Sequence, residues 1–302
     1  MKAIETRGDV MKAIETHNLT KYYGDVCGID GVSLSVDEGA FFGFIGPNGA
    51  GKSTLIRTLL GLISPTSGSA EIFGRDIVGG KLENLKEIGY LPAEADFYNG
   101  MKVRDVLRFT AKMRGLDCDE EAKELCRRLD LDVNRKVSEL SLGNKKKVGI
   151  VCALQHKPRL YVLDEPTSGL DPLMQQEFFK ILKERNDEGA TIFLSSHVLS
   201  EIKKHCKSAG IIREGKLVLL DTVDNLAHTG VKKVAVKGAF SITELAGIED
   251  VRVDGDQTTF LFSGDVKALL TALSGMDISD VSITDPELDE IFMNYYVKEE
   301  NR

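Results

Sequence analysis

The fold of this chain is decided by Gly46-Pro47-Asn48-Gly49-Ala50-Gly51-Lys52-Ser53-Thr54. This stretch matches the pattern GxxxxGK[ST], in which glycines let the backbone curl so that its N–H groups converge on phosphate oxygens. The apolar run Phe41–Ile45 before it predicts a buried strand, and the apolar spacing after it predicts a helix over 52–61. A strand before the glycines and a helix after them are the context that the motif requires. We therefore expect a nucleotide-phosphate site here.

The residue types of this loop suit the phosphates of a nucleotide and a divalent cation. The N-terminus of the following helix adds partial positive charge where the backbone amides converge. Lys52 is expected to reach the β- and γ-phosphates, and the Ser53 hydroxyl is expected to ligate Mg²⁺. The alternative is a glycine-rich turn that fits the pattern by chance, but such a turn needs neither the strand nor the helix beside it.

A second motif places two carboxylates, Asp164 and Glu165, after the apolar run Arg159–Leu163. Carboxylates at the end of a buried strand are costly unless a cation or a proton transfer uses them. We expect Asp164 to hold Mg²⁺ through water and Glu165 to polarise the attacking water. Alone, this pattern also fits a strand that ends in a polar turn, and the phosphate loop is what favours the catalytic interpretation.

Further motifs resemble those of ATP-binding cassette (ABC) ATPases. Leu140–Asn144 resembles a degraded LSGGQ signature, Ser168–Asp171 looks like the D-loop of that family, and His197 looks like its switch histidine. Tyr23 stands where the family places an aromatic residue that stacks on adenine, with the adjacent Tyr22 as the alternative. The order and spacing of these motifs match over most of the chain, which is therefore identified as a member of this family.

The resemblance implies ATP hydrolysis by a head-to-tail dimer that closes on two ATP molecules. Each ATP would lie between the phosphate loop of one subunit and the signature of the other. The signature residues expected to meet it are Ser141, Gly143 and Asn144. His197 would contact the γ-phosphate and help Glu165 to hold the attacking water, and Asp171 belongs to the D-loop. Closure by ATP and opening after hydrolysis would form a two-state switch.

The sequence departs from the family pattern at two places. The glutamine of the family's Q-loop is expected after Gly89–Pro92, but Ala93 stands there and Glu94 follows. Two hypotheses stay open: Glu94 takes over the contact with Mg²⁺ and water, or this contact is absent. In the signature, Leu142 replaces a glycine and Asn144 replaces the glutamine, and a side chain at position 142 restricts backbone approach.

The basic run Lys145–Lys147 directly after the signature also has two interpretations. A charge run on a helix is usually a solvated face, and we predict that here. The alternative is that these lysines add attraction for phosphate.

Two domains are predicted after an N-terminal extension. MKAIET occurs at 1–6 and again at 11–16, so we treat residues 1–10 as an addition before the natural start and exclude them from the fold. Over 11–228 strands alternate with helices, which predicts an α/β domain with a mainly parallel sheet covered on both faces. With the motifs, this domain resembles the P-loop NTPase core of ABC ATPases, with a helical subdomain at about 94–145. Residues 229–302 are expected to form an accessory α+β domain.

The individual elements follow from hydrophobic patterns. Helices are predicted over 101–132 and 144–156, and strands over Arg159–Leu163 and Ala190–Ser195. In the second domain, strand patterns at 231–237, 249–253, 258–263 and 278–284 alternate with helical patterns at 241–246 and 264–274. A hairpin turn is expected at Gly255. This order is typical of a split βαβ domain, and an acidic helix over 286–299 closes the chain.

Composition limits the class of partner. Lys and Arg number 39 and Asp and Glu number 47, which gives a net charge of −8. This balance disfavours a protein that coats nucleic acid or carries a polybasic membrane anchor. No apolar run approaches the ~18 residues of a membrane-spanning helix. Five cysteines without a CxxC pair are typical of the reducing cytoplasm.

We therefore expect an ATPase subunit, with ATP and Mg²⁺ as cofactors, on the cytoplasmic face of the membrane, docked on a separately encoded permease. The tail Ile283–Tyr296 and details of the motifs resemble bacterial export-type (ABC-2) ATPases of the antibiotic, bacteriocin and multidrug kind. One alternative is a soluble ABC ATPase that acts on ribosomes or nucleic acid, but no second cassette or long coiled-coil insertion is present. Another is a P-loop kinase, which needs neither a signature nor a switch histidine. No nucleic-acid partner is expected.

Overall fold

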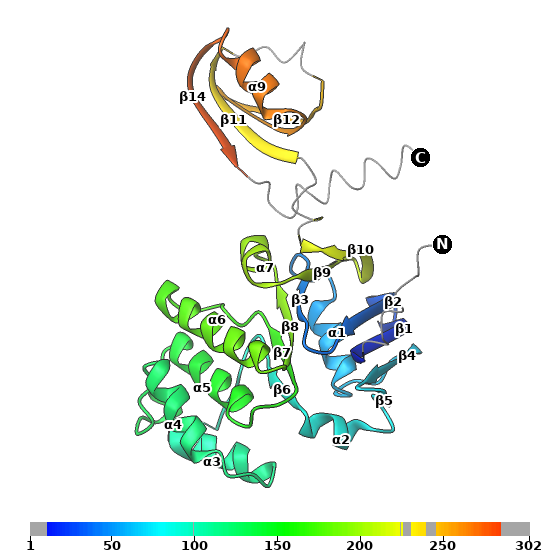
Figure 1. Ribbon diagram of the computed structural model, residues 1–302, viewed down its shortest axis with the longest axis vertical. Helices are drawn as coiled ribbons and strands as arrows, with labels where there is room; N and C mark the ends of the chain where they lie inside the picture. Colours follow the sequence, from blue (N-terminus) through cyan, green and yellow to red (C-terminus); the bar gives the residue numbers. More distant parts are fainter. Residues whose placement is uncertain (1–10, 99, 224, 226–230, 240–245, 285–302) are drawn as a thin grey trace, which may run out of the picture. The chain divides into compact units, whose positions relative to one another are not determined.

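The computed structural model describes residues 11–98, 100–223, 225, 231–239 and 246–284 (Figure 1). Contacts divide the chain into two compact units, Met1–Asp221 and Thr222–Arg302. The predicted extension over 1–10 and the predicted domain boundary at 228/229 both lie outside the described residues. Within the part of the chain that the structure describes, no helix is both long and apolar enough to cross a membrane.

The first unit contains a six-stranded sheet in the order β10-β9-β3-β8-β7-β6. Its strands are β3 (Phe41–Ile45), β6 (Ile88–Leu91), β7 (Leu160–Asp164), β8 (Thr191–Ser196), β9 (Ser208–Arg213) and β10 (Lys216–Thr222). β9, β3, β8, β7 and β6 pair in parallel, as predicted. All residues of β3, β7 and β8 are buried, which explains why their apolar residues run consecutively instead of alternating with polar ones. The buried polar residues Asp164, Ser195 and Ser196 stand at the carboxyl ends of β7 and β8.

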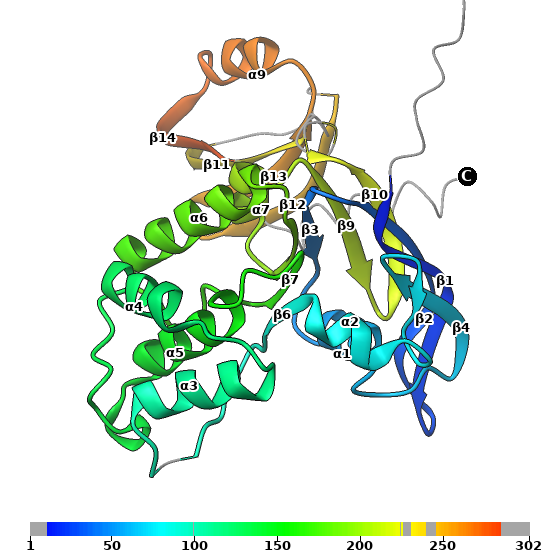
Figure 2. The same cartoon turned by 60° about the horizontal axis from the view of Figure 1, so that its bottom comes forward.

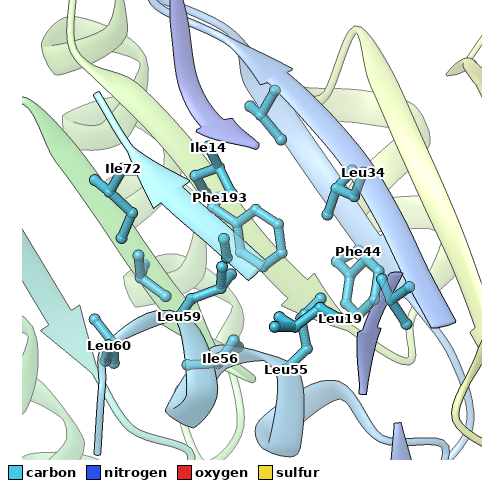
Figure 3. Close-up of a cluster of buried hydrophobic side chains, with 14 of the residues drawn as sticks. Ile14, Leu19, Leu34, Phe44, Leu55, Ile56, Leu59, Leu60, Ile72 and Phe193 are labelled. Atoms are coloured by element: carbon cyan, nitrogen blue, oxygen red, sulfur yellow. The ribbon is translucent and has the colours of Figure 1, made fainter. Parts of the chain in front are cut away.

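An antiparallel sheet in the order β2-β1-β4-β5 accompanies this one (Figure 2). It consists of β1 (Lys12–Tyr23), β2 (Val26–Asp37), β4 (Ser67–Ile72) and β5 (Arg75–Asp76). The helix α1 (Lys52–Leu59) buries Leu55, Ile56 and Leu59 in a cluster with side chains of both sheets, such as Ile14 and Phe193 (Figure 3). Burying each of these side chains contributes about 1.5–3 kcal/mol, so the cluster fixes α1 and the loop before it.

The other face of the parallel sheet is also covered. α7 (Leu199–His205) approaches β3 so closely that a Cβ on Gly43 would lie 2.6 Å from Ile202. The remaining helices of this unit are α2 (Lys81–Lys86), α3 (Val103–Met113), α4 (Asp119–Arg128), the 3₁₀ turn η1 (Val137–Glu139), α5 (Leu142–Leu154) and α6 (Pro172–Asp187). The single helix predicted over 101–132 is wrong, because the chain turns at Gly115 with φ at +70° and starts α4 afresh.

The second unit has a four-stranded antiparallel sheet in the order β12-β13-β11-β14. Its elements are β11 (Val231–Ala239), β12 (Ile248–Asp254), β13 (Gln257–Ser263), α9 (Val266–Leu273) and β14 (Asp277–Thr284). Leu269 and Leu273 of α9 pack on Phe260 and Phe262 of the sheet. The hairpin turn at Gly255 is confirmed. The helical pattern predicted at 241–246 lies almost wholly outside the described residues, and the helix predicted over 286–299 lies entirely outside them.

Candidate active site

Three neighbouring parallel strands place the predicted site residues at one edge of the sheet. The order β3-β8-β7 places the phosphate loop, which follows β3, beside the carboxyl ends of the other two strands. Asp164, at the end of β7, is the register partner of Ser195 on β8. In open α/β sheets this edge is where ligands bind.

Close packing explains two of the glycines in the phosphate loop. A Cβ on Gly46 would lie 2.4 Å from the carbonyl oxygen of Ile212, and a Cβ on Gly51 would lie 2.4 Å from that of Gly28. Gly51 also has φ at +108°, a conformation that side-chain-bearing residues rarely adopt. Only glycine therefore lets the loop pack this closely against β9 and β2.

Lys52 is folded back over this loop, with only 6% of its surface exposed. Its ammonium donates to the carbonyl oxygens of Gly46 at 2.6 Å and Pro47 at 3.1 Å. It also forms an ion pair with Glu165, at 3.1 Å from Oε1. The lysine charge thus lies between the phosphate loop and the carboxylate that the sequence predicts to be the base.

The Asp164 carboxylate is held by two serines. Ser53 Oγ donates to Oδ2 at 2.6 Å, and Ser195 Oγ donates to Oδ1 at 2.6 Å. Hydroxyl and carboxylate oxygens are the ligands that Mg²⁺ prefers, so Ser53 and Asp164 fit this ion. Among the described residues no group of three or more His, Cys, Asp or Glu side chains could hold a metal.

Glu165 has an unusual backbone and two neighbours. Its φ is +47°, which is uncommon for a residue with a side chain and is found at functional sites. Oε2 lies 2.8 Å from Nδ1 of His197, and the buried Oε1 faces Lys52 without a hydrogen-bond partner among the described residues. The carboxylate thus lies between the Lys52 ammonium and the His197 ring.

A pocket of about 350 Å³ joins Tyr23 to the phosphate loop. Its lining consists of Tyr23, Val26, Cys27, Gly28, Pro47, Asn48, Gly49, Gly51, Lys52, Ser53, Thr54, Ala93 and Glu165. Tyr23 is 46% exposed, so part of its side chain is accessible to a planar ligand. Tyr22, the alternative, is absent from this lining.

The signature residues surround a different pocket, of about 760 Å³. Ser141, Gly143, Asn144 and Asp171 all line it, and no described residue lines both pockets. Ser141 caps α5 by accepting from the amide of Asn144, and a Cβ on Gly143 would lie 2.5 Å from the carbonyl oxygen of Gly169. The signature thus adjoins the D-loop of its own chain and not its own phosphate loop.

One prediction from the sequence needs correction, and one residue is added to the site. The run Lys145–Lys147 is not a solvated face, because Lys146 and Lys147 are 4% and 8% exposed, respectively. Glu94 is exposed, and the neighbouring Ala93 lines the pocket instead. The sequence analysis also missed the part played by Ser195, which holds Asp164 and accepts from the amide of Glu165 at 3.2 Å. Its place at the end of the apolar run Ala190–Ser195, two residues before His197, is the signal that could have identified it.

Comparisons with known proteins agree with this geometry. The profile of the family described as ABC transporter matches residues 29–168. The bacitracin transport ATP-binding protein of Bacillus licheniformis is 36% identical, over 93% of this chain and 96% of its own. The linearmycin resistance ATP-binding protein of Bacillus subtilis is 30% identical, over 93% and 97%. A solved ATP-binding subunit of an ABC transporter is 32% identical, with a TM-score of 0.67 over 71% of this chain and 91% of that one. The chain therefore belongs to the ABC transporter family, as one of its ATP-hydrolysing, ATP-binding subunits.

Proposed function

We propose that the pocket between Tyr23 and the phosphate loop binds ATP with Mg²⁺, and that Glu165 acts as the general base for hydrolysis. The observation that carries this proposal is the arrangement of Glu165, whose two oxygens face Lys52 at 3.1 Å and His197 at 2.8 Å. A carboxylate in this position can accept the proton of an attacking water while a histidine orients it.

Each side chain has a distinct task in this proposal. Lys52 and the amides of the loop bind the β- and γ-phosphates, and the Tyr23 ring stacks on adenine. Ser53 and Asp164 would hold Mg²⁺, and the ion would neutralise phosphate charge when bound. As water attacks the γ-phosphorus, its proton passes to Glu165 and the bond to the β-phosphate oxygen breaks. His197 keeps Glu165 in place and contacts the γ-phosphate. The role of Glu94 toward Mg²⁺ and water stays open, since its side chain is exposed.

We infer that two copies of the chain act as a head-to-tail dimer. Ser141 and Asn144 line a pocket distinct from that of the phosphate loop. A signature that contacts ATP must therefore do so on another copy, across an interface. The α5 N-terminus and the Ser141 hydroxyl supply hydrogen-bond donors for the γ-phosphate there.

We further propose that the subunit powers export through a separate permease, from the cytoplasmic face of the membrane. The proposal is supported by the two relatives above, one of which is named for bacitracin transport and the other for linearmycin resistance. An exposed apolar surface suits such a partner, because Leu82 and Met113 are 71% and 72% exposed at the rim of a groove of about 570 Å³. No nucleic-acid partner is proposed, in line with the net charge of −8.

Lys52→Ala tests the proposed nucleotide site. This change removes the cation placed against the phosphates, so tight ATP binding should be lost in calorimetry. Lys112→Ala, at an exposed lysine on α3, is the control and should bind ATP like the wild type. Unchanged ATP affinity in Lys52→Ala would contradict the proposed site.

Copurification tests the transport role. After extraction in mild detergent, the chain should copurify with a membrane protein. Recovery with ribosomes or nucleic acid instead would favour the alternative of a soluble ABC ATPase.

A further inference from the structure

Lys146 is a buried lysine that none of the roles above uses. It lies in the second turn of α5, whose N-terminus carries the signature, and only 4% of its surface is exposed. Its ammonium donates to the carbonyl oxygens of Pro92 at 3.2 Å and Ala93 at 2.8 Å. It forms no ion pair with any residue that the structure describes. Two backbone carbonyls are thus the partners of this buried charge.

A buried ammonium is costly, so its surroundings need an explanation. Burial lowers the pKa of Lys146 to about 8, and the charges of Asp164, Glu165 and Glu94 act in the opposite direction. Lys146 therefore lies within electrostatic reach of both carboxylates of the proposed catalytic site. A methionine would fill the same space without the desolvation penalty, so packing alone does not account for a lysine here.

Around Lys146, α5 packs closely against β6 and against the segment that follows it. A Cβ on Gly89 would lie 2.1 Å from the carbonyl oxygen of Ala153 on α5. A Cβ on Gly149 would lie 2.9 Å from Leu91 and 3.3 Å from Ala95. With Lys146 holding the two carbonyls between Leu91 and Ala95, the segment is fastened to α5 at the point where Ala93 lines the pocket.

We propose that Lys146 is a positioning residue for ATP hydrolysis: it fixes the backbone of Pro92 and Ala93, and with it the pocket wall and Glu94, relative to Asp164 and Glu165. The inference rests on the proposed assignment of hydrolysis to Glu165. Since Lys146 also lies on the signature helix, it links the signature and the ATP pocket of one chain through a single side chain. It donates no hydrogen bond to a phosphate-loop residue among those described, so it acts on the hydrolytic step more than on ATP affinity.

Three substitutions in the full chain test this role. Lys146→Met removes both charge and donors, Lys146→Gln keeps donors without charge, and Lys146→Arg keeps both. The expected order of kcat is Arg above Gln above Met, with a loss of about tenfold to a hundredfold in Lys146→Met. The calorimetric Kd for ATP should stay within about twofold of wild type in all three, because the phosphate loop is intact. Lys112→Met, at an exposed lysine on α3, is the matched control and should keep wild-type kcat.

The outcomes separate this inference from the proposed function. Wild-type kcat in all three variants, or a Kd that rises by the same factor as kcat falls, would overturn the role of Lys146. If Lys146→Met does not fold, Lys146→Gln decides, and a lower kcat with an unchanged Kd supports the role. A wild-type chain without ATPase activity, or tight ATP binding by Lys52→Ala, would instead refute the proposed nucleotide site.

Discussion

At the scale of single residues, Glu165 is held on both sides. Lys52 faces one carboxylate oxygen and His197 the other, while Ser195 accepts a hydrogen bond from its amide. Fixed placement lets one carboxylate act as a base without reorganising during the reaction. Nucleotide binding relies on other groups, the loop amides and Tyr23, so binding and hydrolysis can be separated by substitution.

Glu165→Gln should abolish hydrolysis while ATP binding survives. The amide keeps the shape of the side chain but does not accept the proton of water, so kcat should fall by about 10²–10⁴-fold. Phosphate release and calorimetry measure the two properties independently. The variant should also accumulate as an ATP-bound dimer in size-exclusion chromatography. Wild-type turnover in this variant would refute Glu165 as the base.

The sequence allowed most of this site to be predicted, because its residues form contiguous motifs after strands. The phosphate loop, Asp164, Glu165 and His197 were named from pattern alone. Lys146 was misassigned to a solvated face, although three successive helical residues span 200° at 100° each and cannot all face water on a packed helix. Ser195 was missed because its partner Asp164 comes from another strand, and sequence spacing does not give the order of strands.

At the scale of elements, β6 and α5 pack closely at Gly89. Among the glycines that the structure describes, none has less room for an added Cβ atom. Gly89→Ala would place a Cβ 2.1 Å from the carbonyl oxygen of Ala153, and backbone must shift to relieve this overlap. The free energy of unfolding should fall by ~1–3 kcal/mol. Urea denaturation measures this change through the midpoint of unfolding.

Gly100→Ala is the matched control for this substitution. A Cβ there meets no atom within 4 Å. Its stability should stay within about 0.5 kcal/mol of wild type. Equal stability of Gly89→Ala and Gly100→Ala would show that β6 and α5 are not packed as tightly as described.

Elements were predicted well where they are buried and uniform, and less well among the helices. β3, β7 and β8 are buried throughout and rich in apolar residues, and their predicted bounds lie within one residue of the observed ones. The break between α3 and α4 was not predicted, because Gly115 inside an apolar repeat is compatible with a continuous helix until tertiary packing decides. The pairing of β1 with β4, far apart in sequence, is likewise set by tertiary contacts.

At the scale of the whole molecule, the residues of the proposed ATP site are confined to the first unit. Every residue that lines the pocket beside the phosphate loop lies between Tyr23 and Glu165. His197 comes directly after β8, in the same unit. The second unit has its own hydrophobic core, in which Phe260 and Phe262 pack on α9. Its four strands and the hairpin were predictable because the strands alternate and Gly255 marks a turn.

A chain that ends at Thr229 should bind ATP with the affinity of the full chain. The physical reason is that the first unit keeps its sheet and all proposed ligands when the second unit is removed. Calorimetry on soluble, monodisperse material measures the Kd, with the full chain as reference. If the truncated protein is well folded but does not bind ATP, the first unit is not sufficient for ATP binding and the proposal is refuted.

The half-exposed ring of Tyr23 has an optical consequence. The chain contains no tryptophan, so excitation at a wavelength that only tryptophan absorbs gives no fluorescence from the unchanged protein. Tyr23→Trp would add one fluorophore at the wall of the pocket and keep an aromatic face for adenine. Stacking of the base would change the emission of that single indole, and the entry of nucleotide could be timed against a dark background.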